Sequence, residues 1–168
     1  MKRIFLIGYM GSGKTAMGRM LAAHLGLEFI DLDAYIENKY RLTIARIFEQ
    51  EGETGFREIE RKCLHEVAEF ENVVIGTGGG AACFFDNMEL MNRSGDTIYL
   101  KLSAEHLAAR LATTKAGIRP ILQHKSGDEL LQFIKDNLKH REPYYLQAKY
   151  IIEGNDQEIE RRLIQLEF

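Results

Sequence analysis

Two patterns of hydrophobic residues alternate along the chain. Short, nearly continuous apolar runs are typical of strands buried on both faces of a parallel sheet. They occur at residues 4–7, 29–32, 73–75, 97–102 and 150–152. Between them apolar residues recur at helical spacing, as in residues 14–25, where Met17, Leu21 and Leu25 share one face. The alternation predicts a doubly wound α/β fold, with right-handed crossovers between parallel strands and helices on both sides of the sheet.

Helix starts and one irregular segment can also be identified. The capping-box pattern, in which the first turn of a helix exchanges hydrogen bonds with the residue before it, pairs Ser126 with Glu129 and Asn155 with Glu158. Residues 112–126 are the least periodic part of the chain and contain a glycine and a proline. We therefore expect helices after residues 126 and 155, and a mobile surface loop over residues 112–126.

Composition and charge narrow the class of protein. The 168 residues suit one domain, and 45% apolar with 28% charged residues is ordinary for a globular protein. A formal net charge of −3 supplies no general positive field, so we expect no nucleic-acid partner. No apolar run reaches the length of a membrane span, about 18 residues, so we expect a cytoplasmic protein without a membrane partner. Cys63 and Cys83 are expected to be structural thiols.

A phosphate-binding motif follows the first predicted strand. Residues 8–15 read GYMGSGKT and match the P-loop pattern GxxxxGK[ST]. The glycines let the backbone wrap a phosphate with its N–H groups, and the helix that follows adds its positive end. In this motif Lys14 reaches the β- and γ-phosphates, and Thr15 offers its hydroxyl to Mg²⁺. The strand–loop–helix setting favours nucleotide binding over the alternative, a glycine-rich turn that ends in Lys-Thr by chance.

Two more motifs follow predicted strands, where ligands bind in folds of this type. Asp31 and Asp33 end the second strand, and residues two apart in a strand point the same way. Both carboxylates could then face one cleft, one towards a metal and one towards an acceptor hydroxyl; alternatively, Asp33 caps the helix that follows. Residues 78–80 are three glycines, which suit backbone that lies against an anion, or alternatively a flexible turn.

Three arginines stand outside the regular surface pattern. Arg57 ends the segment GETGFR, Arg119 precedes a proline in the predicted mobile loop, and Arg141 begins the segment REPYY. Each of them alone is most simply interpreted as a solvated surface residue. Arginine is nevertheless the residue that binds carboxylates and phosphates with two parallel hydrogen bonds.

In combination these motifs resemble the shikimate kinase family. The resemblance spans nearly the whole chain and keeps the motif order: residues 8–15, Asp31 and Asp33, Phe56-Arg57 with Glu60, residues 78–80, Arg119-Pro120, and Arg141 with Tyr145. It implies a three-layer P-loop NTPase fold with strand order 2-3-1-4-5. It also implies one kinase domain over residues 1–168, with an acceptor-binding region near residues 33–61 and a lid near residues 112–126. The implied protein is a monomer that phosphorylates shikimate to shikimate 3-phosphate, with ATP as co-substrate and Mg²⁺ as cofactor.

The resemblance implies roles on the acceptor side of the site. Asp33 would orient or deprotonate the attacking hydroxyl. Arg57 and Arg141 would clamp the shikimate carboxylate, with the backbone N–H of Gly79 nearby, and Glu60 would brace Arg57. Phe48 and Phe56 would form apolar walls.

The resemblance also implies roles on the nucleotide side. Asp31 would hold Mg²⁺ through water, alongside Thr15. Arg119 would swing in on the lid and neutralise charge on the transferring phosphoryl group, so that the catalytic set is Lys14, Asp33 and Arg119. Arg110 would lie against adenine. The residues that contact the nucleotide would be Gly11, Ser12, Gly13, Lys14, Thr15, Ala16, Arg110 and Arg119.

Other uses of a P-loop stay open to different degrees. A GTPase switch needs Asp-x-x-Gly and Asn-Lys-x-Asp, and neither pattern occurs. Another small P-loop kinase, such as a gluconate or nucleoside monophosphate kinase, would share the fold and the P-loop chemistry and differ at the acceptor site. A non-catalytic nucleotide-binding regulator is the alternative from a different class. Against it, Lys14, Thr15, Asp33 and Arg119 are all present.

Overall fold

The sheet has the predicted strand order. A computed structural model describes residues 1–113 and 127–168. Its five strands are all parallel, in the order β2-β3-β1-β4-β5. They are β1 (Arg3–Ile7), β2 (Glu28–Asp31), β3 (Val73–Gly76), β4 (Asp96–Lys101) and β5 (Tyr150–Glu153). The predicted α/β fold class is confirmed, and each strand ends within one residue of the apolar run that predicted it.

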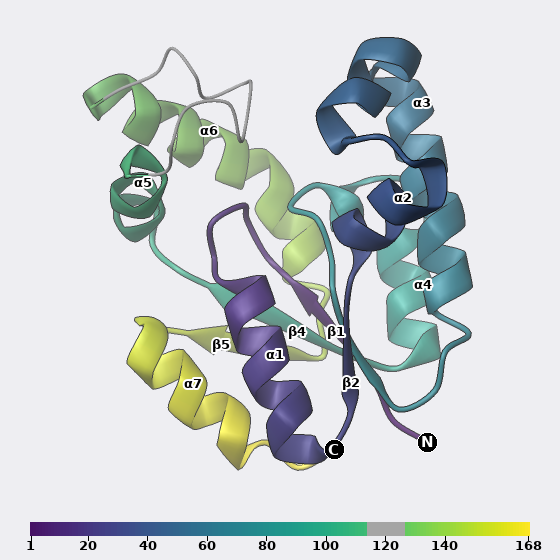
Figure 1. The fold of residues 1–168 in the computed structure, drawn as a ribbon. Coiled ribbons are helices and arrows are strands. Elements are labelled where there is room, and N and C mark those ends of the chain that lie inside the picture. The colour runs from purple at the N-terminus through teal and green to yellow at the C-terminus, as the bar shows by residue number, and fades with distance from the viewer. Residues whose placement is uncertain (114–126) are drawn as a thin grey trace.

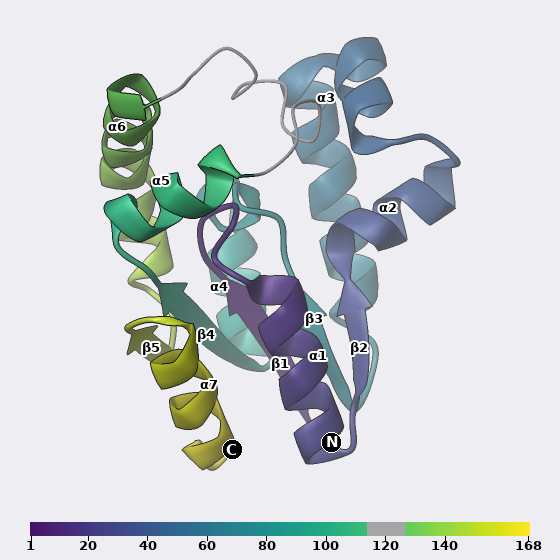
Figure 2. The same cartoon turned by 60° about the vertical axis from the view of Figure 1, so that its left-hand side comes forward.

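Helices cover both faces of this sheet. In Figures 1 and 2, α1 and α7 lie on one face, while α4 and much of α3 and α6 lie on the other. The bounds are α1 (Lys14–Leu25), α2 (Leu32–Tyr40), α3 (Ile44–Val67), α4 (Asn87–Ser94), α5 (Ala104–Ala112), α6 (Gly127–Tyr145) and α7 (Asp156–Gln165), with a single 3₁₀ turn, η1 (Ala81–Cys83). Sheet and helices together form the three layers that the sequence predicts.

The alternation of side chains along the central strand divides the core in two. Ile4 and Leu6 of β1 point into the cluster that contains residues of α1 and α7. Phe5 and Ile7 point the opposite way, into the cluster formed with α3 and α4. All four side chains are fully buried. A central strand with two buried faces explains why the run at residues 4–7 is apolar without interruption.

The predicted irregular segment is only partly within the described residues. Ala112, at its predicted start, is the last residue of α5, so the helix runs further than expected. Residues 114–126 of the predicted lid, with Arg119 and the predicted cap Ser126, lie outside the described residues. The second capping box is confirmed: Asn155 Oδ1 accepts from Glu158 N at 2.9 Å, and Glu158 Oε1 accepts from Asn155 N at 3.3 Å. Within residues 1–113 and 127–168, no helix has the length and apolar character of a membrane span.

Candidate active site

The P-loop joins β1 to α1 in the predicted strand–loop–helix arrangement. Gly11 and Gly13 have φ angles of 79° and 90°, a region that side chains with a Cβ rarely adopt, and Gly13 is the N-cap of α1. Lys14 is buried, and its Nζ donates to the carbonyls of Gly8 at 2.7 Å and Tyr9 at 2.9 Å. The loop thus places an ammonium group and the positive end of a helix at one point, which is a suitable cradle for phosphate.

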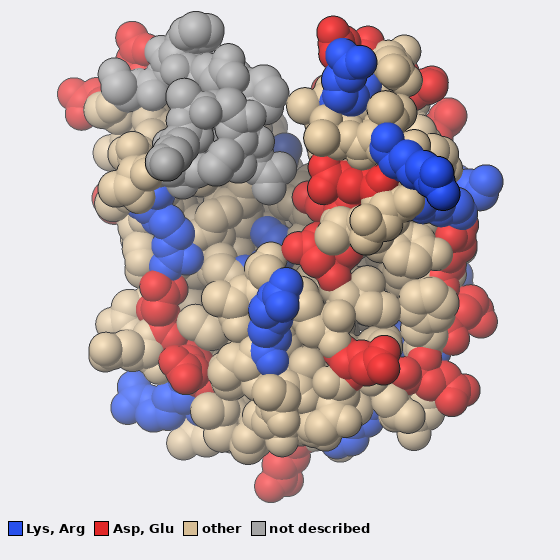
Figure 3. All heavy atoms as spheres, in the orientation of Figure 1, with Lys and Arg blue, Asp and Glu red and all other residues tan. Residues whose placement is uncertain are grey.

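A pocket of about 360 Å³ opens at the carboxyl ends of the strands. In Figure 3 a hollow lies in this face of the molecule, with acidic side chains at its rim and basic groups within it. The residues that line the pocket come from the P-loop and α1 (Met10, Gly11, Gly13, Lys14, Thr15, Ala16), the second predicted motif (Asp31, Asp33), the segment after β3 (Gly76, Thr77, Gly78, Gly79) and α5 (Arg110). The pocket therefore brings together three of the segments that the sequence singled out.

The strand-alternation argument for Asp31 and Asp33 is wrong. Helix α2 begins at Leu32, so only Asp31 belongs to β2, and Asp33 lies in the first helical turn. The capping residue is Asp31 rather than Asp33: its Oδ1 accepts from Ala34 N at 3.2 Å. Both carboxylates still line the pocket, because the helix starts at the carboxyl end of the strand. The expected convergence holds, but a helix N-terminus produces it.

Thr15 and Asp31 form an oxygen pair suited to magnesium. Thr15 Oγ1 donates to Asp31 Oδ2 at 3.1 Å, beside the P-loop. Magnesium prefers oxygen ligands and commonly keeps several waters and phosphate oxygens, so it needs few protein ligands. In keeping with that, the described part of the chain contains no group of three or more His, Cys, Asp or Glu side chains that could hold a metal alone. The residues present fit the predicted metal position.

Arg57 is a buried arginine on α3. Its side chain is only 10% exposed, and Nη1 donates to Glu60 Oε1 at 2.9 Å, one turn along the helix. Glu60 is 1% exposed. Burial raises the pKa of the Glu60 carboxyl, and the nearby Arg57 guanidinium opposes that rise. The predicted Arg57–Glu60 contact is present, and it leaves the far edge of the guanidinium for another partner.

Arg141 belongs to α6 and lies against the P-loop. Its Cζ lies 5.5 Å from the ring centroid of Tyr9 in the P-loop. Its Nη1 is buried and has no hydrogen-bond partner among the described residues. An unsatisfied buried donor is expensive unless a ligand completes it. Arg141 is therefore positioned to bind an anionic or carbonyl group of a ligand.

The three glycines lie where these charged groups meet. None of them has a left-handed φ, so the sequence is explained by close approach rather than by backbone conformation. A Cβ on Gly79 would lie 2.9 Å from Met10 N of the P-loop and 3.5 Å from Arg141 Nη1. A Cβ on Gly80 would lie 2.5 Å from Arg57 Nη2. Side chains here would displace the P-loop or the arginines.

A buried tyrosine holds this glycine segment from below. The hydroxyl of Tyr145, at the end of α6, donates to the carbonyl of Gly79. Its ring packs on Tyr99 of β4, with centroids 5.0 Å apart, and Tyr99 donates to Glu142 Oε2 at 2.9 Å. Burial raises the pKa of both tyrosines, so both hydroxyls stay protonated donors.

The two predicted apolar walls contact each other on α3. The rings of Phe48 and Phe56 have centroids 4.5 Å apart and are tilted by 32°. Between them Gly52 interrupts the helix with a φ of 71°. The interruption bends α3 so that residues eight apart can stack, which an unbroken helix would hinder.

Arg110 has a different set of contacts from a simple adenine platform. Its Nη1 donates to the P-loop carbonyl of Gly11 at 2.8 Å, and its Nη2 pairs with Asp156 at the start of α7 and with His106 Nε2 at 3.3 Å. Arg110 lines the pocket, so a nucleotide contact stays a prediction. The Arg110 guanidinium therefore links α5 to both the P-loop and α7.

The family model of shikimate kinase matches residues 10–166. The chain belongs to the shikimate kinase family. A shikimate kinase of Parabacteroides distasonis is 59% identical over 148 residues, which cover 88% of this chain and 85% of that protein.

Two solved members of the family have the same fold. The crystal structure of shikimate kinase from Bacteroides thetaiotaomicron superposes with a TM-score of 0.89 at 52% identity, and covers 96% of this chain and 94% of that one. Shikimate kinase from Acinetobacter baumannii in complex with shikimate gives 0.86 at 40% identity, and covers 97% and 89%. The P-loop fold that the resemblance implied is confirmed.

Within this family site, sequence reasoning missed the aromatic residues beneath the arginines. Tyr9 occupies a variable position of the P-loop pattern and packs against Arg141. Phe84 packs against Arg57, with its ring centroid 4.2 Å from Cζ. The only signal in the sequence was an aromatic residue close to a motif, and that signal does not say which arginine it meets.

Proposed function

We propose that this protein transfers the γ-phosphoryl group of ATP to a ring hydroxyl of shikimate and forms shikimate 3-phosphate. Membership of the shikimate kinase family supports the reaction. The single observation that carries the choice of acceptor is the convergence of Arg57 and Arg141 on residues 78–80, beside Asp33 and opposite the P-loop. Two arginines from different helices suit a carboxylate, and a neighbouring Asp suits hydroxyls.

The acceptor is bound through its carboxylate. Arg57 offers the edge of its guanidinium that Glu60 leaves open, and Arg141 offers its buried Nη1, which lacks a partner among the described residues. Gly79, whose carbonyl is held by Tyr145, contributes its backbone N–H. This arrangement disfavours acceptors without a carboxylate, because the buried Nη1 of Arg141 would then stay unpaired and Arg57 would keep only its acidic neighbours on α3.

Transfer relies on positioning and on positive charge. Asp33 accepts a hydrogen bond from the attacking hydroxyl and takes its proton as the bond to phosphorus forms. Lys14 exchanges the carbonyls of Gly8 and Tyr9 for the β- and γ-phosphate oxygens, and the N-terminus of α1 adds to the positive field. We assign to Arg119, which lies outside the described residues, the neutralisation of charge on the transferring phosphoryl group. The leaving group is ADP.

Magnesium belongs in this proposal as the cofactor of ATP. Thr15 and Asp31 would hold it, as the 3.1 Å contact between these two side chains beside the P-loop supports. When bound, the ion neutralises charge that develops on the phosphate oxygens.

The test is ADP release from ATP and Mg²⁺ in four parallel reactions, with shikimate, gluconate, a nucleoside monophosphate or no acceptor. Stimulation by shikimate alone is the expected result. Turnover with gluconate or a nucleoside monophosphate would show that shikimate is not the acceptor, and would leave the proposed P-loop chemistry in place. ATP binding with no acceptor-dependent turnover would instead indicate a nucleotide-binding regulator.

A further inference from the structure

Phe84 lies closer to Arg57 than Phe56 does, the other aromatic residue of the described chain that contacts this guanidinium. Its ring centroid is 4.2 Å from Arg57 Cζ, compared with 5.3 Å for the neighbouring Phe56. Phe84 follows the single turn η1 and is partly buried. A guanidinium at this distance from a ring face has a favourable cation–π contact, which strengthens as water is excluded.

The turn η1 is folded around this guanidinium. Gly80 is the residue before the turn and Phe84 the residue after it, and both lie against Arg57. The turn is fixed by backbone bonds from Ala81 N to the carbonyl of Gly78 at 3.1 Å and from Cys83 N to that of Gly80 at 3.0 Å. The segment that forms the glycine loop therefore also carries the ring.

Arg57 needs such a contact because its hydrogen bonds do not fix its plane. Nη1 donates to Glu60, whereas Nε has no hydrogen-bond partner among the described residues and makes only a 3.9 Å ion pair with Glu53, whose side chain is 64% exposed. One hydrogen bond fixes the position of a planar fork but leaves rotation about that bond open. A ring stacked against the guanidinium restricts this rotation.

The geometry points to Phe84 as a positioning residue for the acceptor site: its ring holds the Arg57 guanidinium in the orientation that binds a substrate carboxylate. This inference rests on the proposed function, because it needs a carboxylated acceptor at Arg57. Phe84 itself meets no reacting atom in this assignment. Its effect on turnover passes entirely through Arg57.

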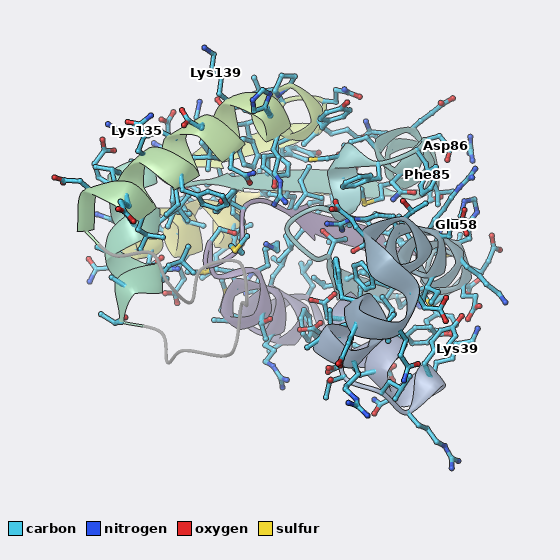
Figure 4. The ribbon with its side chains drawn as sticks, turned by 90° about the horizontal axis from the view of Figure 1, so that it is seen from above. Lys39, Glu58, Phe85, Asp86, Lys135 and Lys139 are labelled. Atoms are coloured by element: carbon cyan, nitrogen blue, oxygen red, sulfur yellow. The ribbon has the colours of Figure 1, made fainter. Side chains whose placement is uncertain are left out.

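The chain supplies a matched control in the next residue. Phe85 is 53% exposed, and its ring centroid lies 5.0 Å from Cζ of Arg61, a surface residue whose Nη2 is 3.1 Å from Asp86 Oδ1. Figure 4 shows Phe85 and Asp86 at the outer edge of the molecule. The same residue type thus makes the same kind of contact one position away, with a surface arginine in place of Arg57.

The first experiment compares Phe84→Leu, Phe84→Tyr and Phe85→Leu with the unaltered protein in steady-state kinetics. We expect Phe84→Leu to raise the KM for shikimate about tenfold and to leave the KM for ATP within about twofold. Phe84→Tyr keeps the ring and should stay within about twofold for both substrates, as should Phe85→Leu. Equal losses for shikimate and ATP, or a Phe84→Leu variant that matches Phe85→Leu, would overturn the inference.

A double-mutant cycle then tests whether the effect passes through Arg57. Shikimate affinity is measured by calorimetric titration for Phe84→Leu, Arg57→Ala and the double variant. Loss of the Phe84 effect in the Arg57→Ala background is the expected coupling, and a full additive effect would contradict it. An unaltered protein without shikimate-dependent turnover would remove the proposed function and this inference together. An active one with uncoupled variants would remove this inference alone.

Discussion

The proposed nucleotide side and the proposed acceptor side of the site are built in different ways. The nucleotide side is built chiefly from one loop: residues 8–15 supply the glycine backbone, the lysine and the hydroxyl within eight consecutive positions, with Asp31 and Arg110 beside them. The acceptor side draws Asp33 from α2, Arg57 from α3, the glycines from the segment after β3 and Arg141 from α6. A contiguous motif needs only its own backbone to be correct, whereas the assembled side needs the whole sheet order and helix packing.

The difference teaches where the two functions can be separated. Backbone groups dominate the nucleotide side, so its geometry is altered chiefly by changes in the loop itself. Side-chain charges dominate the acceptor side, so single substitutions there should affect shikimate and spare ATP. The two sides meet where Gly79 packs on Met10 and where Arg141 lies on Tyr9. Variants away from this seam are the ones that test the separation.

The largest effect is expected at Asp33. Asp33→Asn keeps the shape of the side chain but removes the carboxylate that we propose takes the proton of the attacking hydroxyl. We expect kcat to fall about 10²- to 10⁴-fold, the range of general-base contributions. ATP affinity, measured with a fluorescent nucleotide, should change little, because Asp33 belongs to the acceptor side. A loss of kcat under about threefold would contradict the proton-transfer role.

Removal of Arg57 tests the acceptor side by charge. Arg57→Ala should lower kcat/KM for shikimate about 30- to 1,000-fold, which corresponds to a loss of about 2–4 kcal/mol of transition-state stabilisation. The KM for ATP should stay near its original value. The control is Arg61→Ala, one turn further along α3, where the side chain is 43% exposed and pairs with Asp86 at the surface. We expect no more than a twofold change there, because exposed ion pairs contribute little. Equal losses for ATP and shikimate in Arg57→Ala would refute the carboxylate clamp.

The sequence predicted the contiguous nucleotide side of this site better than the assembled acceptor side. The P-loop could be recognised because its chemistry needs fixed residue types at fixed spacing. For Asp31 and Asp33 the convergence was right and the reason wrong, because Asp31 starts a helix where a continued strand was expected. Nothing in the sequence distinguished Phe84, which contacts Arg57, from Phe85, which faces outward. That distinction depends on how η1 turns, and so on packing between distant segments.

A smaller effect is expected from filling the space at Gly80. A Cβ there would lie 2.5–2.9 Å from three atoms of the Arg57 guanidinium. Arg57 is buried and bonded to Glu60, so it cannot give way without leaving its position. Gly80→Ala should therefore raise the KM for shikimate about tenfold, as expected for overpacking by a methyl group. An unchanged KM for shikimate would show that the guanidinium has room to move, and would weaken the argument for close approach.

The smallest expected effect is a pH dependence of stability. It arises because the two sides stabilise their buried positive charges in different ways. Lys14 bonds to backbone carbonyls, which do not titrate, whereas Arg57 depends on the Glu60 carboxyl. Burial raises the pKa of Glu60, Asp33 adds to the rise, and Arg57 and Arg141 oppose it. The folded protein therefore keeps this proton to a higher pH than the unfolded chain, where the pKa is about 4.5.

The sign of the pH dependence follows from that raised pKa. The stability that Glu60 contributes is fully present below its unfolded pKa and is lost as the pH rises through the folded pKa. Glu60→Gln cannot titrate, so the free energy of unfolding of the original protein minus that of the variant should fall across this window, by at most about 1.4 kcal/mol per pH unit. Urea denaturation of both proteins between about pH 4 and 7 measures this difference. A difference that rises with pH would mean that Arg57 outweighs burial, and that the acceptor side stabilises its buried charge as firmly as the P-loop does.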